Sequence, residues 1–173
     1  MIDPGEEPES IQGAIASRRL TPVGVLVTHG HIDHIGAVAP VARWADSAVY
    51  MAADDAHWLR ELAPDLEPDV LVRGGERLQI GPFIVDVLAV PGHSPGHVAF
   101  LVEGVLFGGD ALFRGSVGRV DLPGGDWPTL ERSLRSLIAD LPPDTLVLPG
   151  HGPATTLAEE ARTNPFLTGA VRP

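Results

Sequence analysis

The sequence predicts a single layered α/β domain over residues 1–173, and three observations lead to this prediction. Short apolar runs typical of buried strands alternate with segments in which apolar residues recur at helical spacing. A composition of 44% hydrophobic and 20% charged residues is that of a chain able to bury an adequate core. Histidines and aspartates closely follow several of the apolar runs, where rigid scaffolds place functional loops.

The first half of the chain predicts three helices and two strands, after a strand end at residues 1–3. A helix over residues 7–19 would carry Ile11 and Ile15 on one face. The apolar run at 23–27 is typical of a strand buried on both sides. Beyond it we expect a helix over 35–44, a strand at 48–51 and a helix over 54–62 that Asp54 caps.

The second half predicts two strand pairs, one long helix and a last strand, after a linker-like stretch at 64–68. The helix has the strongest pattern, because Asp126 can cap it, leucines and an isoleucine form one apolar stripe, and Pro142-Pro143 stops it. The expected bounds are 77–80 and 83–90 for the first strand pair, 98–102 and 105–107 for the second, 126–141 for the helix and 145–148 for the last strand.

A cluster of three histidines and one aspartate directly follows the predicted strand at 23–27. Its members are His29, His31, Asp33 and His34, and no strand or helix propensity explains them. Imidazole nitrogens and carboxylate oxygens are the usual ligands of zinc and similar divalent cations. The cluster therefore predicts a metal site at the end of this strand.

Three further candidate ligands, His93, Asp110 and His151, each lie beside glycines shortly after an apolar run. Taken alone, each histidine could be a hydrogen-bonded structural residue, and the aspartate could be a turn residue. The first cluster, however, needs partners to complete its coordination. Seven such groups exceed the needs of one tetrahedral ion, whereas two ions that share a carboxylate would use them all. We therefore predict two divalent cations that share a carboxylate, and Asp110 is a candidate for that shared ligand.

The remaining histidines and one serine receive other interpretations. His97 lies in the same loop as His93, and we expect it to hydrogen-bond within the site rather than to coordinate a metal. His57 lies beside Trp58 on a predicted helix and is expected at the surface. Ser94 lacks a predicted base and carboxylate relay, so it is not a candidate nucleophile.

Composition excludes several kinds of site and partner. The chain has no cysteine, which excludes disulfides and thiolate metal sites and agrees with a reducing, cytoplasmic location. A net charge of −11 with 12 scattered basic residues argues against a nucleic-acid partner. The sequence shows no apolar run of membrane-spanning length, no secretory signal and no phosphate-binding loop motif.

These motifs, in this order, resemble those of the metallo-β-lactamase superfamily. The chain looks most similar to hydroxyacylglutathione hydrolases (glyoxalase II) and their shorter bacterial relatives, and the resemblance extends over essentially the whole chain. The segments that carry it are residues 3–5, 91–97, 109–113, 115–126 and 150–156.

The resemblance implies a four-layer αββα sandwich with the metals at one edge of its two sheets. It also implies a ligand set, in which His29, His31 and His93 hold one cation, Asp33, His34 and His151 hold the other, and Asp110 bridges them. A hydroxide between the cations, oriented by Asp33, would attack the carbonyl of a small-molecule thioester or ester. Zinc is the expected metal, and iron and manganese also suit this ligand set.

The chain departs from the glyoxalase II pattern at both ends and in the expected substrate site. Those enzymes carry a C-terminal helical domain, and none is expected here. Arg119 matches a basic residue that contacts glutathione, but Asp121 replaces an aromatic residue, so a glutathione thioester and a different thioester or small ester both stay open. Family members have two or more strands before the segment at 3–5, so we expect a sandwich without its first strands and with an unpaired sheet edge.

Two alternatives stand beside the binuclear hydrolase. A persulfide dioxygenase would use one iron and would not need Asp33, His34 and His151 as ligands, so their presence favours two metals. A metal-binding remnant with little activity would result if missing first strands weakened the fold. The sequence leaves the oligomeric state open.

Overall fold

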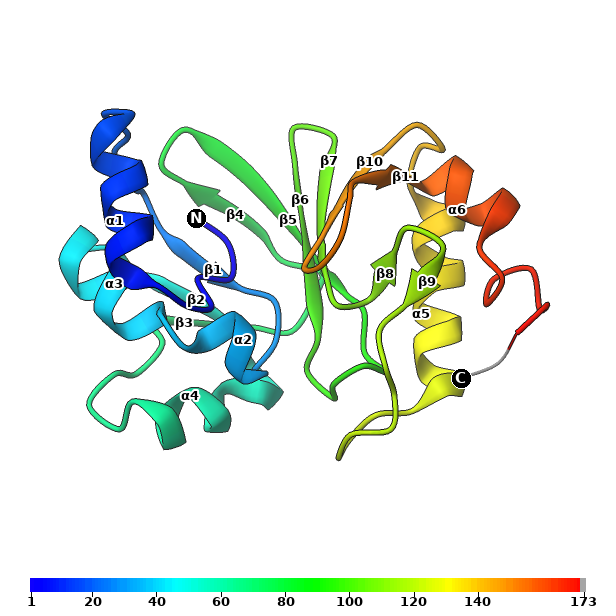
Figure 1. Cartoon of the computed structure of the whole chain (residues 1–173), viewed down its shortest axis with the longest axis horizontal. Helices are drawn as coiled ribbons and strands as arrows, with labels where there is room; N and C mark the ends of the chain where they lie inside the picture. Colours follow the sequence, from blue (N-terminus) through cyan, green and yellow to red (C-terminus); the bar gives the residue numbers. More distant parts are fainter. Residues whose placement is uncertain (172–173) are drawn as a thin grey trace.

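The computed structural model describes residues 1–171 and has four layers, in the order helices, sheet, sheet, helices (Figure 1). The expected αββα architecture is therefore confirmed. The two sheets pack face to face, and helices cover the outer face of each, because both faces of the sheets carry apolar side chains. Within the described residues, no helix combines the length and apolar character needed to cross a membrane.

The first sheet is parallel and has the strand order β1-β2-β3. Its strands are β1 (Val25–Val27), β2 (Val49–Ala52) and β3 (Val70–Val72). The helical elements on its outer side are α1 (Pro8–Ser17), α2 (Ile32–Ile35), α3 (Val38–Ala45), the 3₁₀ turn η1 (Ala53–Asp55) and α4 (Ala56–Leu62). Because the strands are parallel, their carboxyl ends lie at the same edge of the sheet.

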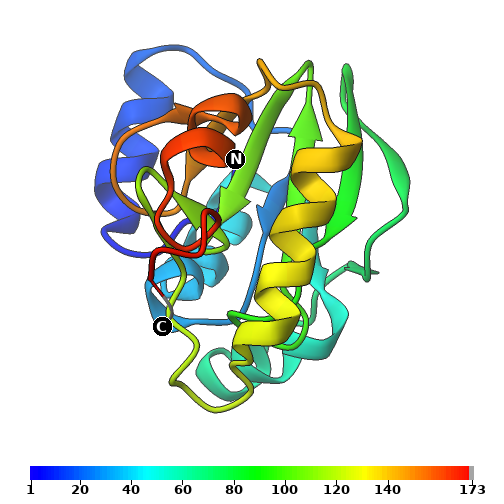
Figure 2. The same cartoon turned by 90° about the vertical axis from the view of Figure 1, so that its right-hand side faces the viewer.

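The second sheet is mixed, with the order β11-β10-β7-β6-β5-β4, in which β10 and β7 are parallel and the other pairs antiparallel. Its strands are β4 (Arg77–Ile80), β5 (Phe83–Ala89), β6 (Val98–Val102), β7 (Val105–Gly109), β10 (Leu146–Pro149) and β11 (Thr155–Thr156). Helices α5 (Trp127–Asp140) and α6 (Leu157–Thr163) cover its outer face, where α5 runs along the strands (Figure 2). A separate hairpin of β8 (Leu112–Phe113) and β9 (Ser116–Val117) follows β7.

Three apolar layers fill the space between these elements. Val27 and Met51 belong to the layer between the first sheet and its helices. Phe100 is fully buried between the two sheets. Leu130 and Leu134 of α5 pack in the third layer, against the second sheet. The apolar stripe predicted for this helix is therefore confirmed, and it holds α5 on the sheet.

Two predicted helix starts are wrong. The helix predicted over 35–44 is split into α2 and α3, because the chain at Pro4 and Gly5 crosses it there. Ala37 N donates to Pro4 O (2.9 Å), and a Cβ on Gly36 would lie 2.3 Å from Gly5 O. Asp54 does not cap α4, since its exposed carboxylate pairs with an arginine instead and the chain enters α4 through η1.

Short elements escaped prediction. β3 lies just after the proline-rich stretch at 64–68, and the hairpin of β8 and β9 has only two residues in each strand. α6 is a seven-residue helix with its own cap, since Glu159 N hydrogen-bonds to Thr156 Oγ1 (3.3 Å). These elements are too short to give a clear periodic pattern. The predicted cap of α5 is present, because Asp126 Oδ2 accepts a hydrogen bond from Thr129 N (2.9 Å).

Residues 1–3 extend along β1 as a single β-bridge between Ile2 and Leu26. Leu26 N donates to Met1 O and Asp3 N donates to Leu26 O, both at 2.9 Å. This short pairing delivers Asp3 to the same edge of the sheet at which β1 ends. The absence of further opening strands from the sandwich stays a prediction.

Candidate metal centre

The predicted ligands meet at one edge of the sandwich, where strands of both sheets end. β1 ends shortly before His29, and the parallel neighbours β7 and β10 end directly before Asp110 and close to His151. The loop between β5 and β6 carries His93. The first backbone N–H of β6 donates to Thr28 O at the end of β1 (2.9 Å), which joins the two sheets here. Loops from both sheets are therefore held side by side.

The first group consists of His29, His31 and His93, whose facing ring nitrogens all lie within 4.8 Å of one another. His31 Nδ1 and His93 Nε2 are 2.8 Å apart. In two of these rings the other nitrogen has a hydrogen-bond partner. His93 Nδ1 lies 2.7 Å from Arg119 O, and His29 Nδ1 lies 3.0 Å from Thr28 Oγ1. Such support is usual for metal-binding histidines, because it fixes the ring orientation.

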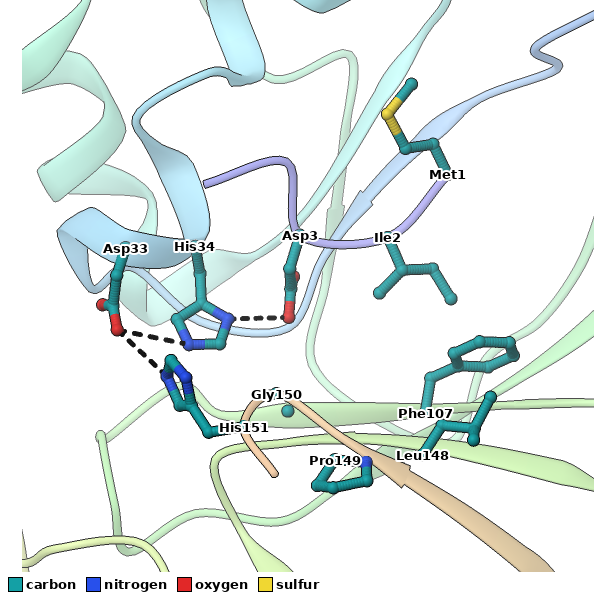
Figure 3. A pocket seen from close by; sticks show the side chains of 11 residues that line it. Met1, Ile2, Asp3, Asp33, His34, Phe107, Leu148, Pro149, Gly150 and His151 are labelled. Carbon is teal, nitrogen blue, oxygen red and sulfur yellow. Dashed lines mark hydrogen bonds and ion pairs between the residues drawn. The ribbon is translucent and has the colours of Figure 1, made fainter. Parts of the chain in front are cut away.

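The second group consists of Asp33, His34 and His151, again with ligand atoms within 4.8 Å (Figure 3). Asp33 Oδ2 lies 3.0 Å from His151 Nε2 and 3.8 Å from His34 Nε2. The other nitrogen of His34, Nδ1, faces Asp3 Oδ2 at 3.0 Å. His34 is buried, whereas the side chains of Asp33 and His151 are 47% and 54% exposed, so this group opens to solvent.

Asp110 lies between the two groups. Its Oδ1 is 3.2 Å from His34 Nε2, and its Oδ2 is 3.5 Å from His151 Nε2 and 3.7 Å from His93 Nε2. The backbone N–H of Asp110 donates to His97 Nε2 (3.0 Å). One carboxylate thus faces members of both groups, while His97 holds the backbone that carries it.

Several polar atoms of the seven residues are buried without a hydrogen-bond partner, which fits the binding of two cations. Within residues 1–171, His29 Nε2, His34 Nε2 and Asp110 Oδ1 are buried without a hydrogen-bond partner. The last two lie 3.2 Å apart, but not in hydrogen-bond geometry. A Cβ on Gly150 would lie 2.3 Å from Asp110 Oδ1, so only glycine leaves this space free. Buried polar atoms are normally paired, and a cation would partner all three. Their role as metal ligands stays a prediction.

Burial favours the neutral form of three histidines in or beside the first group. It lowers the pKa of His29 well below the ordinary value, and positive charge on neighbouring histidines lowers it further. Burial also lowers the pKa of His31. It lowers the pKa of His97 to about 3, with a further contribution from His93. Neutral imidazole is the form that binds a metal.

His34 behaves differently from these histidines. Burial alone would lower its pKa, but the facing carboxylates of Asp110 and Asp3 outweigh burial and raise the pKa of His34 to about 10. Burial would likewise raise the pKa of Asp110, yet the proximity of His34 lowers it. In the metal-free protein His34 is therefore protonated at neutral pH.

Metal binding should release at least one proton per protein at pH 7, because a cation at His34 Nε2 must displace the proton held there and ionisation of a metal-bound water adds to the release. Affinity should rise with pH up to the pKa of His34, near 10, since fewer molecules then carry that proton. Isothermal titration calorimetry at pH 7 in two buffers of different ionisation enthalpy measures the release. Identical heats in both buffers would contradict the prediction.

Two aspartates of the site were missed as functional residues by sequence reasoning. Asp3 Oδ1 accepts from Thr28 N (2.7 Å) and Asp3 Oδ2 accepts from Thr28 Oγ1 (2.7 Å), besides facing His34. Asp55 is completely buried and lies on the 3₁₀ turn after β2. Asp3 is the last residue of a predicted strand end and Asp55 comes soon after the predicted strand at 48–51, so nearness to a strand end was the available signal.

Two other predicted positions lie apart from the groups. The side chain of Arg119 is exposed and makes a bidentate pair with Asp121 (2.7 and 2.8 Å), so only its carbonyl contacts the site, through His93. Its role in substrate binding stays a prediction. His57 is exposed and faces Asp54 O (3.1 Å), as expected for a surface residue.

The chain is similar to known proteins in both sequence and structure. A family model described as the metallo-β-lactamase superfamily matches residues 1–151. A probable metallo-hydrolase, YqgX of Bacillus subtilis, is 40% identical over 98% of this chain and 87% of its own length. Hydroxyacylglutathione hydrolase GloC of Haemophilus influenzae is 35% identical over 96% and 86%.

Solved structures agree with these matches. The BLEG-1 B3 metallo-β-lactamase superimposes with a TM-score of 0.90 and 41% identity, over 96% of this chain and 87% of its own. TTHA1623 in a di-iron-bound form superimposes with a TM-score of 0.85 and 45% identity, over 96% and 88%.

Proposed function

Because this chain belongs to the metallo-β-lactamase superfamily, we propose that it is a binuclear metal-dependent hydrolase acting on a small-molecule thioester or related acyl ester. One observation carries this proposal: seven side chains from four separate stretches converge in two groups, with Asp110 facing both. The similarity to a hydroxyacylglutathione hydrolase over nearly the whole chain supports the thioester.

We assign His29, His31 and His93 to one cation, Asp33, His34 and His151 to the other, and Asp110 to both. Two bound divalent cations supply Lewis acidity toward a carbonyl oxygen and an activated water at neutral pH. Zinc is the proposed metal, because the donors are imidazole nitrogens and carboxylate oxygens. Iron is the second candidate, since a 45% identical relative is described in a di-iron-bound form.

The exposure of the candidate ligands indicates the side from which substrate and water reach the centre. His29, His34 and His93 are buried and form the closed wall of the centre, whereas Asp33 and His151 are exposed. Substrate and water therefore approach from the side of Asp33. Its carboxylate is placed to orient a water molecule and to hold a proton from it, which is the role we assign to it.

The opening suits a carbonyl compound with an apolar part. Ile32 lies between two candidate ligands in the sequence and is 61% exposed. The ring of Phe113 lies 6.2 Å from that of His151. The guanidinium of Arg119, the residue predicted to contact an anionic substrate, is already paired with Asp121. These features support a thioester or ester whose binding does not depend on a strong negative charge.

The test combines metal analysis with turnover. Protein purified in zinc-supplemented buffer is analysed for metal by mass spectrometry, and the same sample is assayed with a panel of glutathione thioesters, neutral thioesters and lactones. We expect two equivalents of metal and turnover of at least one thioester that chelation abolishes. A protein that binds no metal, or that holds two metals and hydrolyses none of the panel, would overturn the proposed function.

Asp121 should weaken the binding of anionic substrates. Asp121→Ala frees the guanidinium of Arg119, so KM for an anionic glutathione thioester should fall roughly twofold to fivefold, the modest effect expected of exposed charges. The KM for a neutral thioester should stay unchanged. Asp86→Ala, which removes a carboxylate facing Arg77 instead, is the matched control. Equal changes in KM for both substrates would contradict a role of Arg119 in recognition.

The mononuclear iron dioxygenase is less well supported. It requires the first group only, whereas the second group is equally well assembled here. Oxygen uptake with glutathione persulfide by iron-loaded protein would favour it over the hydrolase.

A further inference from the structure

Asp55 is a buried carboxylate that lies outside both groups of candidate ligands but contacts the loops that carry them. It follows β2, the parallel neighbour of β1, so its turn lies beside the loop that follows β1. Its relative exposure is 0%, and none of the ion pairs within residues 1–171 includes it. A buried carboxylate without a cation is costly unless hydrogen bonds satisfy it.

Three donors satisfy this carboxylate, and they come from two loops far apart in sequence. Gly30 N donates to Asp55 Oδ2 (3.1 Å) from the loop after β1. Ser94 Oγ donates to Oδ2 (2.5 Å) and Gly96 N to Oδ1 (2.8 Å) from the loop between β5 and β6. Asp55 therefore accepts hydrogen bonds from one loop of each sheet.

Two of the three donors lie next to a candidate ligand in the sequence. Gly30 separates His29 from His31, and Ser94 directly follows His93. The distance between the two loops sets the separation of His31 Nδ1 and His93 Nε2, which is 2.8 Å. A shift of either loop away from Asp55 would change the shape of the first group while leaving its residues in place.

The glycines of both loops permit this close approach. A Cβ on Gly96 would lie 2.7 Å from Asp55 Oδ1, and a Cβ on Gly30 would lie 2.8 Å from Asp55 O. Both separations are shorter than side chains tolerate, so the loops carry glycine where they meet Asp55.

We propose that Asp55 is a positioning residue, whose carboxylate clamps the loops of His31 and His93 together and thereby sets the geometry of the first cation site. The proposal rests on the proposed function only in taking the first group as a metal site. It does not depend on which substrate is hydrolysed. The competing interpretation is that Asp55 only stabilises the fold, in which case its loss would weaken folding without changing metal affinity.

The test compares Asp55→Asn with Asp54→Asn, which changes the adjacent, exposed carboxylate. The amide keeps the size of Asp55 but turns one acceptor into a donor, which must then face an N–H or hydroxyl donor. Chelator competition on the full chain measures the affinity for each of two zinc ions. We expect the affinity for one ion to fall about 10- to 100-fold, the usual effect of losing a group that supports a ligand. The other ion should bind nearly as in the unchanged protein.

Ser94→Ala provides a second variant if Asp55→Asn fails to fold. It removes one donor and keeps the carboxylate, so we expect a smaller loss of affinity for the same ion. The cobalt-substituted variants should also show a changed visible absorption spectrum, because ligand geometry at that site has changed. Unchanged zinc affinities and cobalt spectra in the folded variants would overturn the positioning role.

The outcomes for Asp55 and for the proposed function are separable. Unaltered protein that binds two zinc ions but hydrolyses no compound of the panel removes the proposed function and leaves the role of Asp55 standing. Unchanged affinity in the Asp55 variants beside active unaltered protein removes only the role of Asp55. Unaltered protein that binds no zinc counts against both.

Discussion

Replacing Asp110 with alanine should reduce turnover by about a thousandfold or more, a loss of about 4 kcal/mol of transition-state stabilisation. Asp110 is the residue whose carboxylate faces His34, His93 and His151 together. Its loss removes a ligand from both proposed cation sites at once. Metal analysis of the variant should show fewer than two equivalents under conditions that saturate the unaltered protein.

His57→Ala is the control for this experiment. His57 is exposed and interacts with the backbone of Asp54, so its loss should leave both turnover and metal content nearly unchanged. A melting curve of each variant separates loss of the site from loss of the fold. Comparable losses of turnover in the two variants would show that the site has been assigned to the wrong residues.

Replacing Asp3 with asparagine should weaken binding of the second cation by about 10- to 100-fold. Asp3 faces His34 Nδ1 at 3.0 Å, and two bonds from Thr28 hold its carboxylate in place. The carboxylate therefore fixes the orientation of His34, whose other nitrogen points into the second group. An amide has one acceptor fewer and no charge, so it holds the ring less firmly. Chelator competition with zinc measures the loss.

Asp140→Asn is the matched control, because Asp140 is an exposed carboxylate at the end of α5 that accepts a hydrogen bond from Ser136 Oγ (3.2 Å). It should leave both affinities unchanged. The variants of Asp3 and Asp55 should also differ in the ion that they weaken, since the two carboxylates support different groups. If Asp3→Asn weakened the same ion as Asp55→Asn, the division of the ligands between two sites would be wrong.

Much of the fold was predictable because its longer elements have clear periodic patterns. The stripe of Leu130 and Leu134 and the cap at Asp126 identified α5, and the apolar run at 23–27 identified β1. The split between α2 and α3 was not predictable, because the chain at Pro4 and Gly5 causes it through a tertiary contact. Elements of two or three residues, such as β3, give too little pattern to detect.

The candidate site was predictable to the extent that its residues are unusual in the sequence. No strand or helix propensity explains the histidines clustered at 29–34, so they indicated a metal site directly. Asp3 and Asp55 were missed because a single aspartate near a turn or a helix start has an ordinary local explanation. Only their contacts with Thr28, Gly30 and Ser94 distinguish them from turn and cap residues.

The sequence by itself determined the layered architecture and the seven residues proposed as ligands, because periodicity and residue chemistry are local properties. Tertiary structure decided how closely those residues approach one another, which of them are open to solvent and which carboxylates hold them in place. These features depend on the pairing of β1 with β2 and of β7 with β10, and on the bond between the two sheets at Thr28. Contacts between residues so distant in sequence leave no periodic pattern from which they can be predicted.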